Sequence, residues 1–159
     1  MKKTLSLIII GILFIGCSDD EKGIDCCTNI DIGISVKYVN ENGENLFELE
    51  NGGLNESNIN IYHKIDNEWV KYFEWNLDSP KGIRIIERED GKYLGIFPST
   101  VIVENNYSET KIEFSQTDSD IIKTEIDKNG SNTIVTKVWY NDIIKWEANQ
   151  TERMFEIVK

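Results

Sequence analysis

Apolar and polar residues alternate with a period of two along much of this chain. Between residues 30 and 38 every second side chain is isoleucine, valine or tyrosine, and the side chains between them are polar or glycine. The alternation returns at residues 59–65, 110–114 and 122–126. Because a period of two places successive side chains on opposite faces of a strand, these segments are predicted to be half-buried β-strands.

Turn-forming pairs separate the alternating segments. Asn-Gly stands at residues 42–43 and 129–130, Asp-Asn at 66–67 and Asn-Asp at 141–142. Such pairs are typical of tight hairpin connections, so residues 58–75 are predicted to form one hairpin. Further strands are predicted at residues 46–50, 83–88, 93–97, 100–103, 133–140, 143–147 and 154–158.

About eight to ten short strands, without a helical period beyond the first residues, favour an all-β fold. From Thr28 to Lys159, Ile, Val, Thr, Tyr, Phe and Trp supply 50 of 132 residues, whereas Ala, Leu and Met supply seven. β-Branched and aromatic side chains suit a pleated, half-buried surface. The sequence therefore predicts an antiparallel β-sandwich over residues 29–159, with a barrel as the alternative.

The first residues carry a different pattern. Lys2 and Lys3 precede a largely apolar run of eleven residues from Leu5 to Ile15. This run is too short to cross a bilayer and suits the apolar region of a signal peptide. It ends at Cys17 instead of at a pair of spaced small residues, so residues 1–16 are predicted to be a signal peptide.

Residues Phe14-Ile15-Gly16-Cys17 resemble the lipobox of bacterial lipoproteins. The resemblance implies that Cys17 receives a diacylglycerol and becomes an acylated N-terminus after cleavage at Gly16. The chain would then be held at a membrane by its lipid. An ordinary secretion signal with a chance cysteine is the alternative.

A polar segment, residues 17–28, follows and is predicted to be a flexible tether. Its acids Asp19, Asp20 and Glu21 resemble the export signal of surface lipoproteins of the Bacteroidota. That resemblance implies a lipid-anchored protein of the outer membrane, displayed at the cell surface. A merely solvated linker is the alternative.

The domain itself is similar to small uncharacterised lipoproteins of the Bacteroidota. The likeness rests on its many hairpins, on Asn-Gly-Glu-Asn-Leu-Phe after the first strand and on Trp-Tyr-Asn-Asp near the end. It implies a β-sandwich protein of the cell envelope and no particular activity.

The net charge argues against polyanionic partners. Without Lys2 and Lys3, 15 basic residues stand against 28 acidic ones, a formal charge near −13. Nucleic-acid binding and attraction to anionic lipid headgroups need clustered cations, and the sequence has no dense basic patch. Membrane attachment is therefore expected to come from acyl chains alone.

The adjacent Cys26 and Cys27 leave several redox states open. Free or capped thiols, a strained bridge between the two neighbours, and a bridge to another chain are all compatible with an oxidising compartment. A metal site would need further ligands, which the single histidine, His63, does not complete.

Motifs for catalysis and cofactor binding are absent from the sequence. His63 shares a strand face with isoleucines, which predicts a hydrogen-bonded core or rim residue. Asp118-x-Asp120 and Asp127-x-Asn129 loosely resemble oxygen-ligand calcium loops, but the second is explained by its hairpin turn. No cofactor, metal or catalytic residue is assigned, and a small hydrolytic enzyme built on loop carboxylates is the alternative function.

The aromatic residues are the remaining lead. Trp69, Phe73 and Trp75 share a parity and are predicted to lie in the core. Trp139 and Tyr140 are consecutive, so they must project to opposite faces, and one could be exposed to contact a ligand. The sequence thus favours a binding or accessory module for a glycan, a peptide or an envelope partner.

Overall fold

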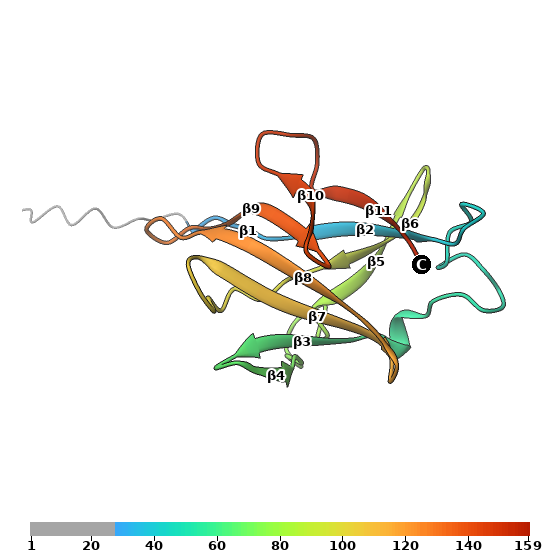
Figure 1. Ribbon diagram of the computed structural model, residues 1–159, viewed down its shortest axis with the longest axis horizontal. Coiled ribbons are helices and arrows are strands. Elements are labelled where there is room, and N and C mark those ends of the chain that lie inside the picture. Colours follow the sequence, from blue (N-terminus) through green and yellow to red (C-terminus); the bar gives the residue numbers. More distant parts are fainter. Residues whose placement is uncertain (1–27) are drawn as a thin grey trace, which may run out of the picture.

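Two mixed β-sheets packed against each other form residues 28–159, the part of the chain that the computed structural model describes (Figure 1). The larger sheet has the order β1-β9-β8-β7-β3-β4, with β10 also paired to β9, and the smaller has the order β11-β2-β6-β5. The predicted all-β, sandwich-like fold is confirmed.

The strands are β1 (Ile30–Asp31), β2 (Ile34–Val39), β3 (Asn60–Ile65), β4 (Glu68–Lys71), β5 (Ile83–Arg88), β6 (Gly91–Ile96), β7 (Tyr107–Ser115), β8 (Asp118–Asp127), β9 (Thr133–Tyr140), β10 (Ile143–Glu147) and β11 (Met154–Val158), with the short 3₁₀ helix η1 (Glu56–Asn58) before β3.

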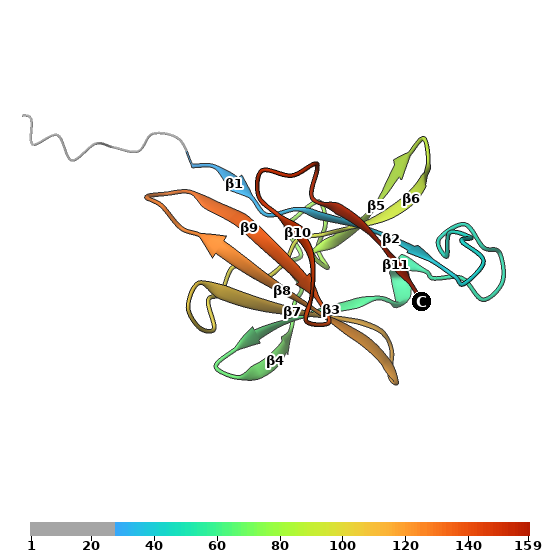
Figure 2. The ribbon, with the colours of Figure 1, turned by 45° about the horizontal axis from the view of Figure 1, so that its top comes forward.

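Two strand pairs are parallel, which the sequence did not predict. β1 pairs with β9, and β11 pairs with β2, in parallel, whereas all other pairs are antiparallel. Both parallel pairs occur where the chain passes from one sheet to the other. The predicted first strand is broken at Ile32–Gly33 into β1 of the larger sheet and β2 of the smaller (Figure 2).

Several hairpin turns adopt the backbone that their residues favour. Asp66 and Asn67 have φ of 50° and 66°, and Asn141 and Asp142 have φ of 46° and 66°. Positive φ at both central residues is what a type I′ hairpin turn requires, and Asn and Asp tolerate it better than most side chains. The predicted turns at these two sites are confirmed.

The predicted strands at residues 46–50 and 100–103 are wrong. Asn45 turns the first segment, because its side chain accepts a hydrogen bond from the Phe47 amide and donates one to the Lys92 carbonyl. In the second, side-chain hydroxyls replace a ladder: Ser99 N–H donates to Thr110 Oγ1, and Val101 N–H donates to Ser99 Oγ. Side-chain hydrogen bonds thus interrupt a regular ladder in both segments, and single backbone bonds, from Leu46 N–H to the Tyr38 carbonyl and from Val103 N–H to the Tyr107 carbonyl, tie them to β2 and β7.

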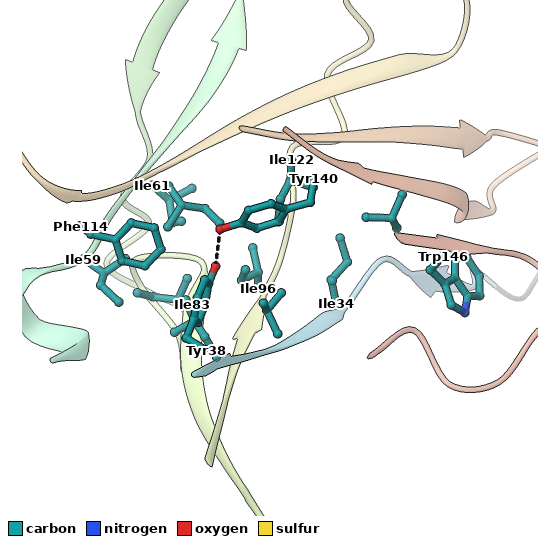
Figure 3. Close-up of a cluster of buried hydrophobic side chains, with 14 of the residues drawn as sticks. Ile34, Tyr38, Ile59, Ile61, Ile83, Ile96, Phe114, Ile122, Tyr140 and Trp146 are labelled. Atoms are coloured by element: carbon teal, nitrogen blue, oxygen red, sulfur yellow. Dashed lines mark hydrogen bonds between the residues drawn. The ribbon is translucent and has the colours of Figure 1, made fainter. Parts of the chain in front are cut away.

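The core lies between the two sheets and consists mainly of isoleucine and valine from the inward faces (Figure 3). Ile61, Ile112 and Ile122 come from the larger sheet, and Ile34 and Leu94 from the smaller. Burying one such side chain stabilises the fold by roughly 1.5–3 kcal/mol. The period-two pattern therefore identified the inward faces of β2, β3, β7 and β8 correctly.

The predicted signal peptide at residues 1–16, Cys17, the acids Asp19, Asp20 and Glu21, and the Cys26–Cys27 pair lie outside the described residues. Within residues 28–159, no helix is long and apolar enough to cross a membrane.

Candidate functional site

Phe73, Trp75 and Leu77 are exposed together on the connection between β4 and β5. Their exposed fractions are 60%, 82% and 48%, and Trp75 is the most exposed large hydrophobic residue of the described chain. Residues 73–77 are called the aromatic loop below. Single exposed apolar residues are common, but three within five residues indicate an interaction surface.

Hydrogen bonds hold both ends of this connection. Tyr72 N–H donates to the Ile61 carbonyl of β3, and Glu74 N–H donates to the Pro80 carbonyl at 2.8 Å, which closes the loop at its base. Leu77 N–H donates to the Glu74 carbonyl, forming a turn at the tip. The aromatic side chains are therefore displayed on a backbone that is already arranged, which lowers the entropy lost on binding.

Lys81 and Gly82 fix the return of the connection to β5. The Lys81 ammonium donates to the carbonyls of Ser57 and Ile59 at 2.6 and 3.1 Å, at the end of η1. Gly82 has φ of 71°, and a Cβ atom there would lie 3.0 Å from the Tyr72 ring. Glycine is needed at this position for both its backbone conformation and its lack of a side chain.

A cavity of about 310 Å³ lies beside the aromatic loop. Phe73, Pro80 and Ile83 form its apolar walls, and Asp78 and Arg84 also line it. The cavity therefore has an apolar centre with a negative and a positive side chain at its border. An apolar centre with a polar rim is typical of protein interfaces.

The prediction that Phe73 and Trp75 are core residues is wrong, and the reason lies in β4. This strand is at the edge of the larger sheet, and it ends at Lys71, so the alternation expected to continue to residue 75 stops. Trp69, on β4, is only partly buried, and Lys64 and Lys111 lie over its ring on the outer face of the sheet. Trp69 therefore faces away from the core, and Phe73 and Trp75 lie beyond the end of the strand, where its parity no longer applies.

Trp139 and Tyr140 do project to opposite faces of β9, as predicted. Trp139 is half-buried on the outer face, where its ring meets Tyr107 edge-on and the ammonium groups of Lys123 and Lys137 lie 5.5 and 5.1 Å from its centroid. Tyr140 is buried in the core. Cations already cover the Trp139 ring, so it offers less free apolar surface than the aromatic loop.

Tyr140 belongs to a buried polar network that ends at the surface. Its hydroxyl lies 3.0 Å from the Tyr38 hydroxyl (Figure 3) and donates to Asp120 Oδ2 at 2.6 Å. Asp120 also accepts hydrogen bonds from Asn141 Nδ2 and Lys159 Nζ, both at 2.7 Å. With every member bonded, the network stabilises the sheet packing.

The network shifts the pKa values of its members in opposite directions. Burial raises the pKa of the Asp120 carboxyl, but hydrogen bonds from Lys159, Tyr140 and Asn141 outweigh it, so the pKa lies below its ordinary value. Burial, and then the neighbouring Tyr38, raise the pKa of Tyr140 far above its ordinary value. Asp120 therefore stays ionised and Tyr140 protonated, which suits a structural role.

Two of the acids that loosely resemble calcium ligands, Asp118 and Asp120, contact a cation of the chain itself. Lys159 Nζ lies 2.7 Å from both Asp118 Oδ1 and Asp120 Oδ2. Within residues 28–159 no three His, Cys, Asp or Glu side chains are grouped to hold a metal ion. Asp127 is exposed at the end of β8, and Asn129 lies in the β8–β9 hairpin.

A second cavity, of about 350 Å³, contains two carboxylates, and each is paired with an arginine. Arg153 binds both oxygens of Asp31, at 3.1 and 3.2 Å, and Arg88 lies 2.8 Å from Glu152. Acid–base catalysis by loop carboxylates needs groups that are free to exchange a proton. In this cavity, each carboxylate is held by an arginine.

His63 lies on the inward face of β3, as predicted, but not with the hydrogen bond expected of it. Its ring stacks on Tyr72, with 4.4 Å between centroids, and its Nε2 atom is buried without a hydrogen-bond partner in the described structure. Burial lowers the pKa of His63 to about 4, so the ring is neutral at neutral pH.

Comparison with protein-family models, with curated proteins and with solved structures found no match to this chain.

Proposed function

We propose that this protein is a lipid-anchored binding module of the outer cell surface, and that its aromatic loop docks into an apolar pocket of an envelope partner protein. One observation carries the proposal: Phe73, Trp75 and Leu77 are exposed at alternate positions of a loop whose base is closed by a hydrogen bond. Tryptophan is among the residues that dominate binding energy at protein interfaces.

The composition of the loop favours a protein partner over a glycan or a peptide. Sugar recognition combines a flat aromatic ring with several hydrogen-bonding side chains, and Leu77 has no stacking face to add. Exposed apolar side chains on a hydrogen-bonded turn are instead suited to enter a preformed apolar pocket, as anchor residues do at protein interfaces. Glycan or peptide binding is the alternative to be distinguished by experiment.

Photo-crosslinking in intact cells tests the proposal. A photoreactive amino acid placed at Asn76, in the middle of the loop, is expected to form a discrete adduct with one envelope protein. The same group placed at Glu41, in the exposed turn after β2, is the matched control and should give no such adduct. Mass spectrometry of the adduct identifies the partner.

Trp75→Ala supplies the decisive variant. It removes the main apolar contact at an exposed site, so the fold should be unaffected while the Asn76 adduct is lost, since truncating an interface anchor costs about 2 kcal/mol or more. An adduct that survives this change, or that forms equally from Glu41, would contradict the proposal. Trp75 fluorescence that responds to envelope oligosaccharides instead would transfer the function to glycan binding.

A further inference from the structure

The larger sheet ends at β4 in a free edge, directly before the aromatic loop. β3 lies on one side of β4, and within residues 28–159 no strand pairs with its other side, which lies at the lower margin of Figure 1. The unpaired N–H and C=O groups of such an edge can pair with a strand of another chain.

The ladder between β3 and β4 determines which residues face this edge. The two-residue turn before β4 makes Glu68 a hydrogen-bonded partner of β3, and Tyr72 N–H donates to the Ile61 carbonyl. Because an antiparallel ladder alternates, the backbone N–H and C=O groups of Trp69 and Lys71 point away from β3. These four groups have no hydrogen-bond partner on the edge side within the described chain.

The exposed apolar surface of the aromatic loop continues onto β4. Val70, between the two outward-facing residues, is 45% exposed, and Phe73 follows two residues after the strand ends. Four of the nine exposed large hydrophobic residues of the described chain thus lie between residues 70 and 77. A protein that docks on the loop therefore also lies beside the free edge of β4.

We propose that the partner protein of the aromatic loop also supplies an extended segment that pairs antiparallel with β4 and lengthens the larger sheet by one strand. This inference rests on the proposed function, because the pocket for the loop and the added strand are assigned to one protein. In this mode of recognition, main-chain hydrogen bonds give affinity and alternate side chains give specificity. Antiparallel pairing is assigned because it is slightly more stable per residue than parallel pairing.

The charges beside β4 favour acidic residues in the added strand. Lys71 and Lys111 lie on the outer face of the sheet, and neither has an ion-pair partner within residues 28–159. The nearby carboxylates of that face are already bonded. Glu109 pairs with Lys64 at 2.6 Å, and Glu113 accepts two hydrogen bonds from side chains of β3.

The added strand is therefore expected to have an acid–apolar–acid pattern. Its residues opposite Trp69 and Lys71 project to the face that carries the lysines, and the residue between them projects to the side of Val70. A sugar or a lipid has no row of N–H and C=O groups at the spacing of a strand, so a polypeptide segment is the occupant that suits this edge.

Photo-crosslinking from Asn76 in intact cells, applied to variants of Lys71, tests the added strand. Lys71→Pro removes an N–H group that points away from β3, and proline is tolerated at such positions of edge strands. Lys71→Thr also lacks the ammonium group but keeps the N–H group, so it is the matched control. We expect the Asn76 adduct to be about tenfold weaker in Lys71→Pro than in Lys71→Thr, since proline removes one hydrogen bond and its ring hinders the approach of the strand.

A charge reversal and a second crosslinking position give readouts that do not depend on proline. Lys71→Glu should weaken the Asn76 adduct about threefold, because like charges would then lie opposite each other across the two strands. A photoreactive amino acid at Val70 should form an adduct with the same protein as the one at Asn76. Circular dichroism and urea unfolding of the variants, purified with Cys17→Ser, check that each of them folds.

The outcomes separate this inference from the proposed function. Equal Asn76 adducts in folded Lys71→Pro and Lys71→Thr, or a Val70 adduct with another protein or with none, would overturn the added strand and leave the aromatic loop as the docking element. An adduct that Lys71→Glu leaves unchanged or strengthens would refute the acidic pattern. An adduct between two copies of this chain would overturn the assignment to an envelope partner. Absence of an Asn76 adduct from the wild type would refute the proposed function, and this inference with it.

Discussion

The direction of the hydrogen bonds between Tyr38, Tyr140 and Asp120 is fixed by chemistry. An ionised carboxylate only accepts, so the Tyr140 hydroxyl must donate its single proton to Asp120. The Tyr38 hydroxyl must therefore donate to Tyr140, and it has no other bond in the core. The two tyrosines look alike in the structure but have unequal roles.

This order predicts unequal costs for removing the two hydroxyl groups. Tyr140→Phe leaves the Tyr38 hydroxyl buried and unpaired and takes a donor from Asp120, which should lower the free energy of unfolding by about 2–3 kcal/mol. Tyr38→Phe leaves the Tyr140–Asp120 bond intact and should cost about 1 kcal/mol or less. Urea unfolding of both variants measures the difference, and a cost for Tyr38→Phe equal to or above that of Tyr140→Phe would contradict the assigned direction.

The hydrogen bonds that join these side chains could not be predicted from the sequence. Tyr38, Asp120, Tyr140 and Lys159 come from four different strands or strand ends and meet only in the folded state. By contrast, the opposite facing of Trp139 and Tyr140 follows from adjacency alone and was predicted. The lack of a partner at His63 Nε2 depends on packing around the ring, so the strand face of His63 could be predicted from the sequence but its unpaired nitrogen could not.

At the level of elements, hairpin turns were the most predictable feature and the β4–β5 connection the least. A turn of Asp66-Asn67 type is determined by the conformational preference of two residues. Where a strand ends is determined by its neighbours: β4 has only β3 beside it, so nothing extends it beyond Lys71. The aromatic loop was therefore mistaken for a core strand, although its residues carry the proposed function.

The β9–β10 turn offers a prediction about element stability. Asp142 has φ of 66°, which glycine adopts without strain, so Asp142→Gly should raise the free energy of unfolding by about 0.5 kcal/mol. Asp142→Val should lower it by about 1–2 kcal/mol, because a β-branched side chain is strained there. Asp127→Gly, at the exposed end of β8, is the control and should destabilise by roughly 0.5–1 kcal/mol. Thermal unfolding compares the three, and stabilisation by both glycines would refute the argument.

For the whole molecule, the length of the predicted tether limits how far the domain, and with it the aromatic loop, can lie from the membrane. If the chain begins at a lipidated Cys17, the twelve residues from Cys17 to Thr28 span about 40 Å at most when fully extended. The high negative charge keeps the domain from adhering to anionic lipid headgroups. Under this proposal, a tether of that length would hold the domain near the membrane and within reach of other envelope proteins.

Surface display predicts a specific role for Asp19, Asp20 and Glu21. These acids follow Cys17 almost at once, where machinery that holds the acyl chains could read them. Replacing all three with Ala should leave folding unchanged, since the predicted tether would contribute nothing to a core and surface substitutions typically shift stability by about ±0.5 kcal/mol. On intact cells, added protease should remove the wild-type domain and leave the triple variant protected.

Labelling with a fatty acid is the control for the protease experiment, because it shows whether the compared proteins carry the lipid. The wild type and the triple variant should incorporate label equally, whereas Cys17→Ala should incorporate none, because the predicted site of attachment is gone. Equal labelling of Cys17→Ala would refute the lipid anchor at Cys17. The limit of about 40 Å between the membrane and the domain would then no longer apply. If Cys17 is labelled but the wild type is protected from protease, or the triple variant is cleaved as readily as the wild type, the acids are only a solvated linker. The aromatic loop would then have to find its partner on whichever side of the membrane the lipid holds it.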